Sequence, residues 1–169
     1  MNADELFINI KIRPISMDDY ETVLKWSKDE AFCSANGWER NRDPKELYNW
    51  WYSCVNNKND HFIRMGIEFE EKLIGYADLA EIKNDTAELG IAIGESQLWG
   101  QGIGSISAKH MMEYAANNLG ITKFTAETHE TNIRSRKMLE KLGFKEISRI
   151  GSEHYLGSMS QLIQFIKKI

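Results

Sequence analysis

The chain has 169 residues, of which 42% are hydrophobic and 27% are charged, close to the composition of ordinary globular proteins. This length predicts one domain over residues 1–169 with a single sizeable core. No apolar run is long enough to cross a membrane and no segment resembles a signal peptide, so we expect a cytoplasmic protein without a membrane partner. The net charge of −4 argues against a nucleic-acid partner, because phosphate binding needs a clustered basic surface.

The N-terminal part predicts one strand followed by two helices. Alternating isoleucines indicate a strand over Ile8–Arg13. Ser16 is a typical N-cap residue and precedes two acids, so a helix is expected to begin there. A second helix is expected to begin at Asp43, with Glu46 completing a capping box. The connecting stretch Phe32–Arg42 has no clear period, which predicts irregular structure.

The remaining chain alternates between patterns of period two and period 3.6. Strands are expected over Phe62–Phe69, Lys72–Glu81, Thr86–Ile93, Lys123–Thr128 and Arg149–His154, and helices over Ser105–Asn118 and Asn132–Lys141. The apolar residues of the tail, 159–169, fit a helix about as well as a strand. Cys33 and Cys54 lack the spacing of metal ligands, so no metal site is expected.

A glycine-rich turn, Trp99-Gly100-Gln101-Gly102-Ile103-Gly104-Ser105, lies between an expected strand and an expected helix. Glycines lack Cβ atoms, and a helix N-terminus offers free N–H groups, so such a turn suits a bound anion such as pyrophosphate. It lacks the lysine of a P-loop. It also places serine where a dinucleotide fingerprint has its third glycine. Taken alone, the turn is equally compatible with a purely geometric role.

A second motif follows one strand later. Residues 132–144 read Asn-Ile-Arg-Ser-Arg-Lys-Met-Leu-Glu-Lys-Leu-Gly-Phe, an amphipathic helix that begins at Asn132 and ends at Gly143. Ser135 lies one turn after Asn132, on the same helix face. The order of glycine turn, strand and this helix is far more specific than either motif alone.

Together these motifs resemble the GNAT superfamily of N-acetyltransferases, most closely its RimJ/RimL-type branch. The family's motif A reads Gln/Arg-x-x-Gly-x-Gly/Ala, which matches residues 99–104 except that Trp99 occupies the Gln/Arg position. Its motif B resembles the segment from Asn132 to Phe144. The order of elements resembles the family over the whole chain.

The resemblance implies an α/β (α+β) fold with a mixed, mostly antiparallel sheet, flanked by about four helices and splayed at the strand that ends at Ile93. It also implies that the ambiguous tail is a final strand. The co-substrate would be acetyl-CoA. Its contacts are expected from Ile91, Ala92, Ile93, Trp99, Gly100, Gln101, Gly102, Ile103, Gly104, Ser105, Asn132 and Ser135.

The implied reaction moves an acetyl group from a thioester directly to a primary amine. Glu88 is the candidate base, because its offset from the turn matches the catalytic glutamate of the family's histone-acetylating members; a purely structural pairing of this carboxylate is the alternative. Leu139 stands where the family has a tyrosine that protonates the thiolate. Ser135 is the substitute candidate, through a hydrogen bond to the sulfur.

The acceptor amine is not specified by the sequence. Contacts to it are expected from Trp26, Phe32, Trp38, Tyr76 and Glu88, because aromatic faces with carboxylates suit a cation. A protein N-terminus, a polyamine, an antibiotic or a small-molecule amine all fit. The alternative to an enzyme is a non-catalytic acyl-CoA-binding module with the same fold. Exposed strand edges also allow a homodimer.

Overall fold

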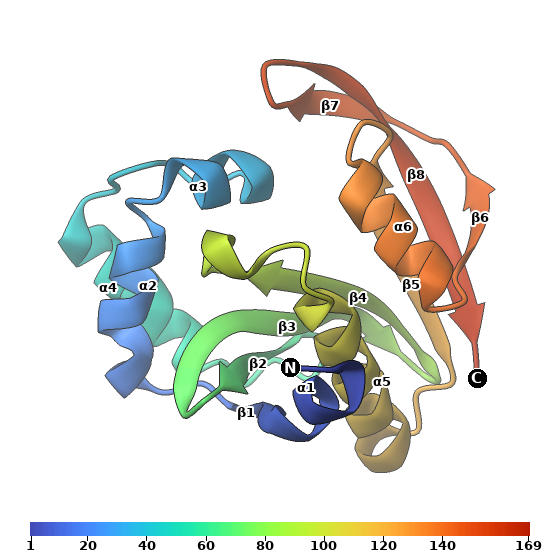
Figure 1. The fold of residues 1–169 in the computed structure, drawn as a ribbon, viewed down its shortest axis with the longest axis horizontal. Coiled ribbons are helices and arrows are strands. Elements are labelled where there is room, and N and C mark those ends of the chain that lie inside the picture. The colour runs from blue at the N-terminus through green and yellow to red at the C-terminus, as the bar shows by residue number, and fades with distance from the viewer.

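The computed structural model describes residues 1–169 and contains one eight-stranded sheet and six α-helices (Figure 1). The sheet order is β1-β2-β3-β4-β5-β8-β6, with β7 paired to β8. The strands are β1 Ile10–Pro14, β2 Ile63–Phe69, β3 Lys72–Lys83, β4 Thr86–Ile93, β5 Lys123–His129, β6 Lys145–Ser148, β7 Ser152–Tyr155 and β8 Ser158–Lys168. The helices are α1 Ala3–Asn9, α2 Tyr20–Trp26, α3 Glu30–Asn36, α4 Pro44–Val55, α5 Ile103–Leu119 and α6 Ile133–Lys141.

Every strand pair is antiparallel except β4 with β5, which is parallel. This parallel pair is short, because only Thr86–Glu88 pairs with Lys123–Thr125. Beyond it, β4 continues to Ile93 and β5 to His129 without pairing to each other. The two halves of the sheet therefore diverge (Figure 1), and the mixed, splayed fold predicted from the sequence is confirmed.

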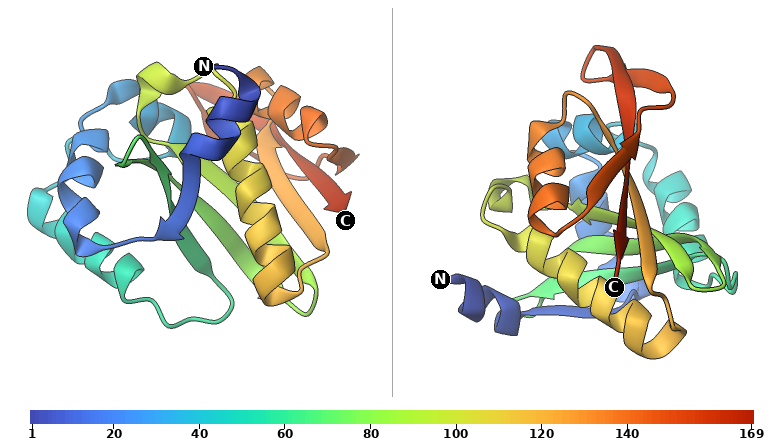
Figure 2. Two further views of the ribbon diagram at one scale, coloured as in Figure 1. Left: turned by 60° about the horizontal axis from the view of Figure 1, so that its bottom comes forward. Right: turned by 90° about the vertical axis from the view of Figure 1, so that its right-hand side faces the viewer.

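Helices cover both faces of the β1–β4 half of the sheet (Figure 2). On one face α5 packs on β1 and β4, and its buried apolar residues belong to a core cluster of 23 residues that extends to α6 and β8. On the other face α2, α3 and α4 enclose a second cluster of nine buried residues around Trp26 and Trp51. No helix is both long and apolar enough to cross a bilayer.

The N-terminal elements differ from the prediction in two places. The expected strand Ile8–Arg13 begins only at Ile10, because Asn2 and Glu5 form a capping box that starts α1. The expected irregular stretch contains α3, which Asp29 caps through a bond from the Phe32 N–H. Six helices are therefore present instead of about four.

Further along, most boundaries agree with the prediction. The helix start at Asp43 is confirmed, although the side chain of Glu46 faces Arg42 at 3.9 Å and makes no reciprocal capping bond. The tail is strand β8, as the resemblance implied. The expected strand Arg149–His154 is displaced to Ser152–Tyr155, and the short strand β6 was not predicted.

Candidate cofactor cleft and acceptor face

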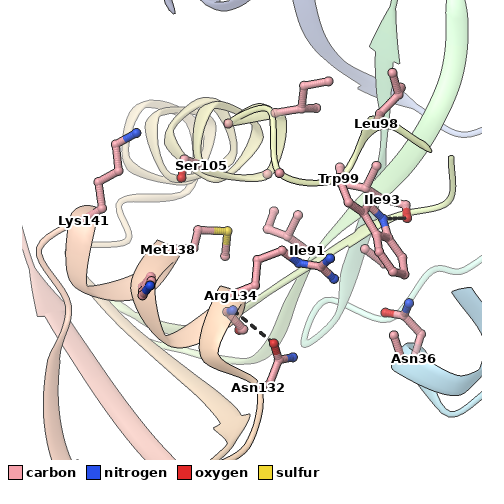
Figure 3. Close-up of a pocket in the computed structure, with 18 residues that line it drawn as sticks. Asn36, Ile91, Ile93, Leu98, Trp99, Ser105, Asn132, Arg134, Met138 and Lys141 are labelled. Carbon is pink, nitrogen blue, oxygen red and sulfur yellow. Dashed lines mark hydrogen bonds between the residues drawn. The ribbon is translucent and has the colours of Figure 1, made fainter. Parts of the chain in front are cut away.

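A cleft of about 290 Å³ lies between the end of β4, the glycine turn and α6, where β4 and β5 have diverged (Figure 3). Eleven of the twelve predicted cofactor residues line it, namely Ile91, Ala92, Ile93, Trp99, Gly100, Gly102, Ile103, Gly104, Ser105, Asn132 and Ser135. The exception is the exposed Gln101, whose side-chain amide donates to the Gln97 carbonyl at 3.4 Å. Seven further residues line the cleft that the sequence did not single out: Ala35, Asn36, Leu98, Arg134, Lys137, Met138 and Lys141.

The glycine turn ends in a helix start that has free donors. Gly100 and Gly102 adopt positive φ angles of 81° and 85°, a conformation that L side chains rarely adopt. No side chain caps α5, so the N–H groups of Ile103, Gly104 and Ser105 have no partner within the helix. These donors and the positive end of the helix dipole lie in the wall of the cleft, where they suit a bound anion.

The opposite wall is the end of β4. Ile91, Ala92 and Ile93 pair with β3 on one edge only, since β5 has already separated on the other. The indole N–H of Trp99 donates to the Ile93 carbonyl at 2.8 Å, which ties the turn to the strand end. An extended ligand arm lying along this free edge would find backbone groups to bond.

Helix α6 closes the cleft with polar and basic side chains. The Asn132 side-chain oxygen accepts from the Ser135 N–H at 3.1 Å, and its amide N–H₂ donates to no other protein group. The Arg134 guanidinium carbon lies 4.1 Å from the centre of the Trp99 ring, in cation–π contact (Figure 3). Leu139 points away into the core and offers no hydroxyl.

The charges that line the cleft are all positive. Arg134, Lys137 and Lys141 line it, whereas no aspartate or glutamate does, although the chain as a whole carries −4. With the free N–H groups of α5, these cations fit a ligand that carries several phosphates, as coenzyme A does. No group of three or more His, Cys, Asp or Glu side chains is arranged to hold a metal ion.

The predicted acceptor residues do not form one open surface. Trp26 and Phe32 are 2% and 0% exposed, so they form the wall behind Tyr76 and Trp38. The Trp38 indole N–H donates to the Tyr76 hydroxyl at 3.3 Å. Tyr76 belongs to the second core cluster, and the partly buried Trp38 packs against it.

This aromatic group already holds a cation. The Arg64 guanidinium lies 4.3 Å from the centre of the Tyr76 ring and makes two bonds to Asp78, at 2.8 and 2.9 Å. The ion pair with Asp78 raises the pKa of Arg64 above its usual value, against the opposing effect of burial. A cationic acceptor would therefore meet a filled aromatic site here rather than an empty one.

Glu88 lies on the solvent-exposed side of β4, at the last residue that pairs with β5. It is outside the lining of the cofactor cleft, four residues before Ala92 and about 13 Å away along the strand. Desolvation raises the pKa of the Glu88 carboxyl above its usual value, and the nearby Glu127 and Glu81 raise it further. These three carboxylates make this side of the sheet acidic.

Comparison with known proteins agrees with this geometry. The model of the acetyltransferase (GNAT) domain family matches residues 9–145. An uncharacterized protein of Methanocaldococcus jannaschii is 32% identical over 143 residues, which cover 83% of this chain and 29% of that protein. The chain thus spans less than a third of the length of this relative.

Two solved structures share the fold. Spermidine N-acetyltransferase from Vibrio cholerae, in complex with CoA and spermine, superposes with a TM-score of 0.81 at 19% identity, covering 95% of this chain and 96% of that one. RimL, a ribosomal L7/L12 alpha-N-protein acetyltransferase in complex with coenzyme A, gives 0.82 at 17% identity, covering 95% and 94%. The splayed sheet, the glycine turn and the family match lead to one conclusion: the chain belongs to the GNAT family of acetyltransferases.

Proposed function

We propose that this chain is an acetyl-CoA-dependent N-acetyltransferase that moves an acetyl group directly to a primary amine. The observation that carries this proposal is the single cleft joining the free edge of β4, the uncapped start of α5 and the basic face of α6. The cleft thus combines an extended backbone edge with an anion site, the two features needed to bind a phosphorylated carrier with a long thiol arm.

Within this proposal the cofactor lies along the cleft. Its pantetheine arm bonds to the backbone of Ile91–Ile93 and accepts from the free amide of Asn132. Its pyrophosphate accepts from the N–H groups at the start of α5, from Gln101 to Ser105. The side chain of Gln101 bonds to the Gln97 carbonyl, so Gln101 contributes to pyrophosphate binding only through its backbone N–H.

The chemistry needs a neutral amine and a stabilised oxyanion. The amine nitrogen attacks the thioester carbonyl, the new C–N bond forms, and the C–S bond breaks. Glu88, which lies outside the cleft lining, takes the ammonium proton through intervening water. A backbone N–H at or near Ile93 stabilises the oxyanion, and Ser135 hydrogen-bonds to the departing thiolate, which takes a proton from solvent.

The acceptor is a primary amine approaching from the acidic side of the sheet. Glu81, Glu88 and Glu127 favour a cationic molecule there over an anionic one. The relatives with known activities act on a polyamine and on a protein N-terminus, and both are amines. Trp38, which is only partly buried, is the aromatic contact, while Tyr76, whose ring Arg64 covers, and the buried Trp26 and Phe32 support it from behind.

The test is thiol release from acetyl-CoA in the presence of a panel of amines: spermidine, peptides with free N-termini, an aminoglycoside and free amino acids. For at least one class of amine, we expect thiol release to be faster than the hydrolysis of acetyl-CoA without an amine. Mass spectrometry then identifies the acetylated amine. Binding of acetyl-CoA without release across this panel would contradict the proposal and favour the non-catalytic acyl-CoA-binding module.

Replacement of Trp99 by phenylalanine is expected to weaken CoA binding about fivefold, because one hydrogen bond contributes roughly 1 kcal/mol. The substitution removes the bond to the Ile93 carbonyl and reduces the stacking surface for Arg134. Isothermal titration with CoA measures the change. Trp50→Phe, which lies outside the cleft, is the matched control. Equal affinities for the two variants would show that Trp99 does not order the site.

A further inference from the structure

The basic residues of α6 form a line rather than a patch. Arg134, Lys137, Met138 and Lys141 are spaced three and four residues apart, which places them on one helix face, and all four line the cleft. Arg134 and Lys141 are seven residues apart, about 10 Å along the helix axis. Figure 3 shows Arg134 directed toward Trp99 and Lys141 on the far side of Met138.

Met138 fixes this line against the glycine turn. A Cβ added at Gly104 would meet the Met138 sulfur at 3.2 Å, so α6 and the start of α5 are in close contact at this point. Lys137 and Lys141 therefore flank the position where the free N–H groups of α5 begin. Neither lysine has a carboxylate within salt-bridge distance, whereas Arg134 is engaged by the Trp99 ring.

The cleft thus offers two sets of donors that suit an anion. One is the start of α5, where backbone N–H groups suit a pyrophosphate. The other is the lysine pair on α6, which is exposed, unpaired and beyond the turn. Coenzyme A carries, besides its pyrophosphate, a phosphate on the 3′-hydroxyl of its ribose, and this group needs cations of its own.

We propose that Lys137 and Lys141 bind the 3′-phosphate of coenzyme A and so select it over 3′-dephospho-CoA. This inference rests on the proposed function, because it assigns one part of the same ligand. Since the lysines are exposed and act as point charges, their contribution is moderate and sensitive to salt. The two lysines affect only the relative affinities for CoA and 3′-dephospho-CoA. They do not affect binding of the acceptor amine.

Isothermal titration at low salt with CoA and with 3′-dephospho-CoA tests the assignment. We expect wild-type protein to bind CoA about tenfold more tightly. In the double variant Lys137→Gln/Lys141→Gln, CoA binding weakens to nearly the dephospho-CoA value, while dephospho-CoA binding stays within twofold. The control Lys109→Gln/Lys145→Gln removes the same charge from exposed positions outside the cleft and keeps the tenfold preference.

Equal affinities of wild-type protein for the two compounds would overturn the inference, as would an unchanged preference in the Lys137/Lys141 variant. Both results leave the cofactor cleft itself in place, because both compounds still bind. Failure of wild-type protein to bind either compound would instead overturn the proposed function, and the inference with it. Thermal melts of the variants confirm that each remains folded.

Discussion

Glu88→Gln is expected to lower kcat/KM about 100-fold, the lower range for loss of a general base. Glutamine keeps the size of the side chain and its place on β4 but cannot accept a proton. The measurement is the initial rate with the best amine of the panel, over a full pH range. Glu113→Gln on α5, an exposed glutamate on the other face of the sheet, is the control and should keep wild-type activity.

The same role predicts a pH dependence with a defined sign. Glu88 must be ionised to accept the proton, so activity falls as the pH drops through its pKa. Desolvation and the neighbouring Glu127 and Glu81 raise that pKa, which places the acid limb of the kcat/KM profile above the usual glutamate range. Glu127→Gln removes one negative charge and should move the limb to lower pH. An unchanged profile in Glu88→Gln would rule out its role as the base.

The second large effect concerns stability. Gly94→Ala is expected to destabilise the fold by about 3 kcal/mol, the upper range for overpacking a core. An added Cβ would lie only 2.0 Å from the Trp26 ring, and Trp26 is buried at 2% exposure with no room to move. Gly94 follows the last residue of β4, so strain there would also disturb the cleft wall at Ile93.

Gly90, which lies on β4 four residues before Gly94, provides the matched control. A Cβ at Gly90 would meet the Asp78 Cβ at 3.6 Å, an ordinary contact, so Gly90→Ala should change stability by less than about 1 kcal/mol. Urea unfolding of both variants measures the difference. If Gly94→Ala unfolds at the wild-type urea concentration, the close packing of α2 on the end of β4 is not present in solution.

Much of the fold was readable because its elements carry local patterns. Strand β4 was predicted at its observed bounds, since Ala87 and Leu89 face one core and alternate with the exposed Glu88 and Gly90. The start of α4 followed from Asp43 and the proline after it. The tail was not decidable from its period, because Ile163 and Phe165 are buried against one core while Leu162 and Ile166 are only half-covered.

The errors occurred where short-range capping or tertiary contacts determine structure. Helix α1 depends on a capping box of two side chains, and α3 has only seven residues between its cap and Gly37. Strand β6 has four mostly exposed residues and is defined by its pairing with β8. Such segments have too few periodic residues for a sequence pattern to distinguish them from loops.

The residues that line the cleft were predicted more completely than the exposed aromatic surface for a physical reason. A glycine turn and a capped helix line the cleft, and these motifs leave a sequence pattern. The basic residues of α6 also follow a pattern, because Arg134, Lys137 and Lys141 are spaced three and four residues apart. The acceptor side depends on which aromatic side chains are exposed, and only the packed structure shows that Arg64 already occupies the Tyr76 face.

The central claim is that acetyl-CoA binds between β4 and α6, and hydrogen–deuterium exchange with and without acetyl-CoA tests it most directly. Binding there predicts slower exchange in peptides that cover residues 90–106 and 132–141, with no change in the exposed loop at residues 57–61. Unchanged exchange in the glycine turn at saturating acetyl-CoA, or protection confined to another surface, would contradict it.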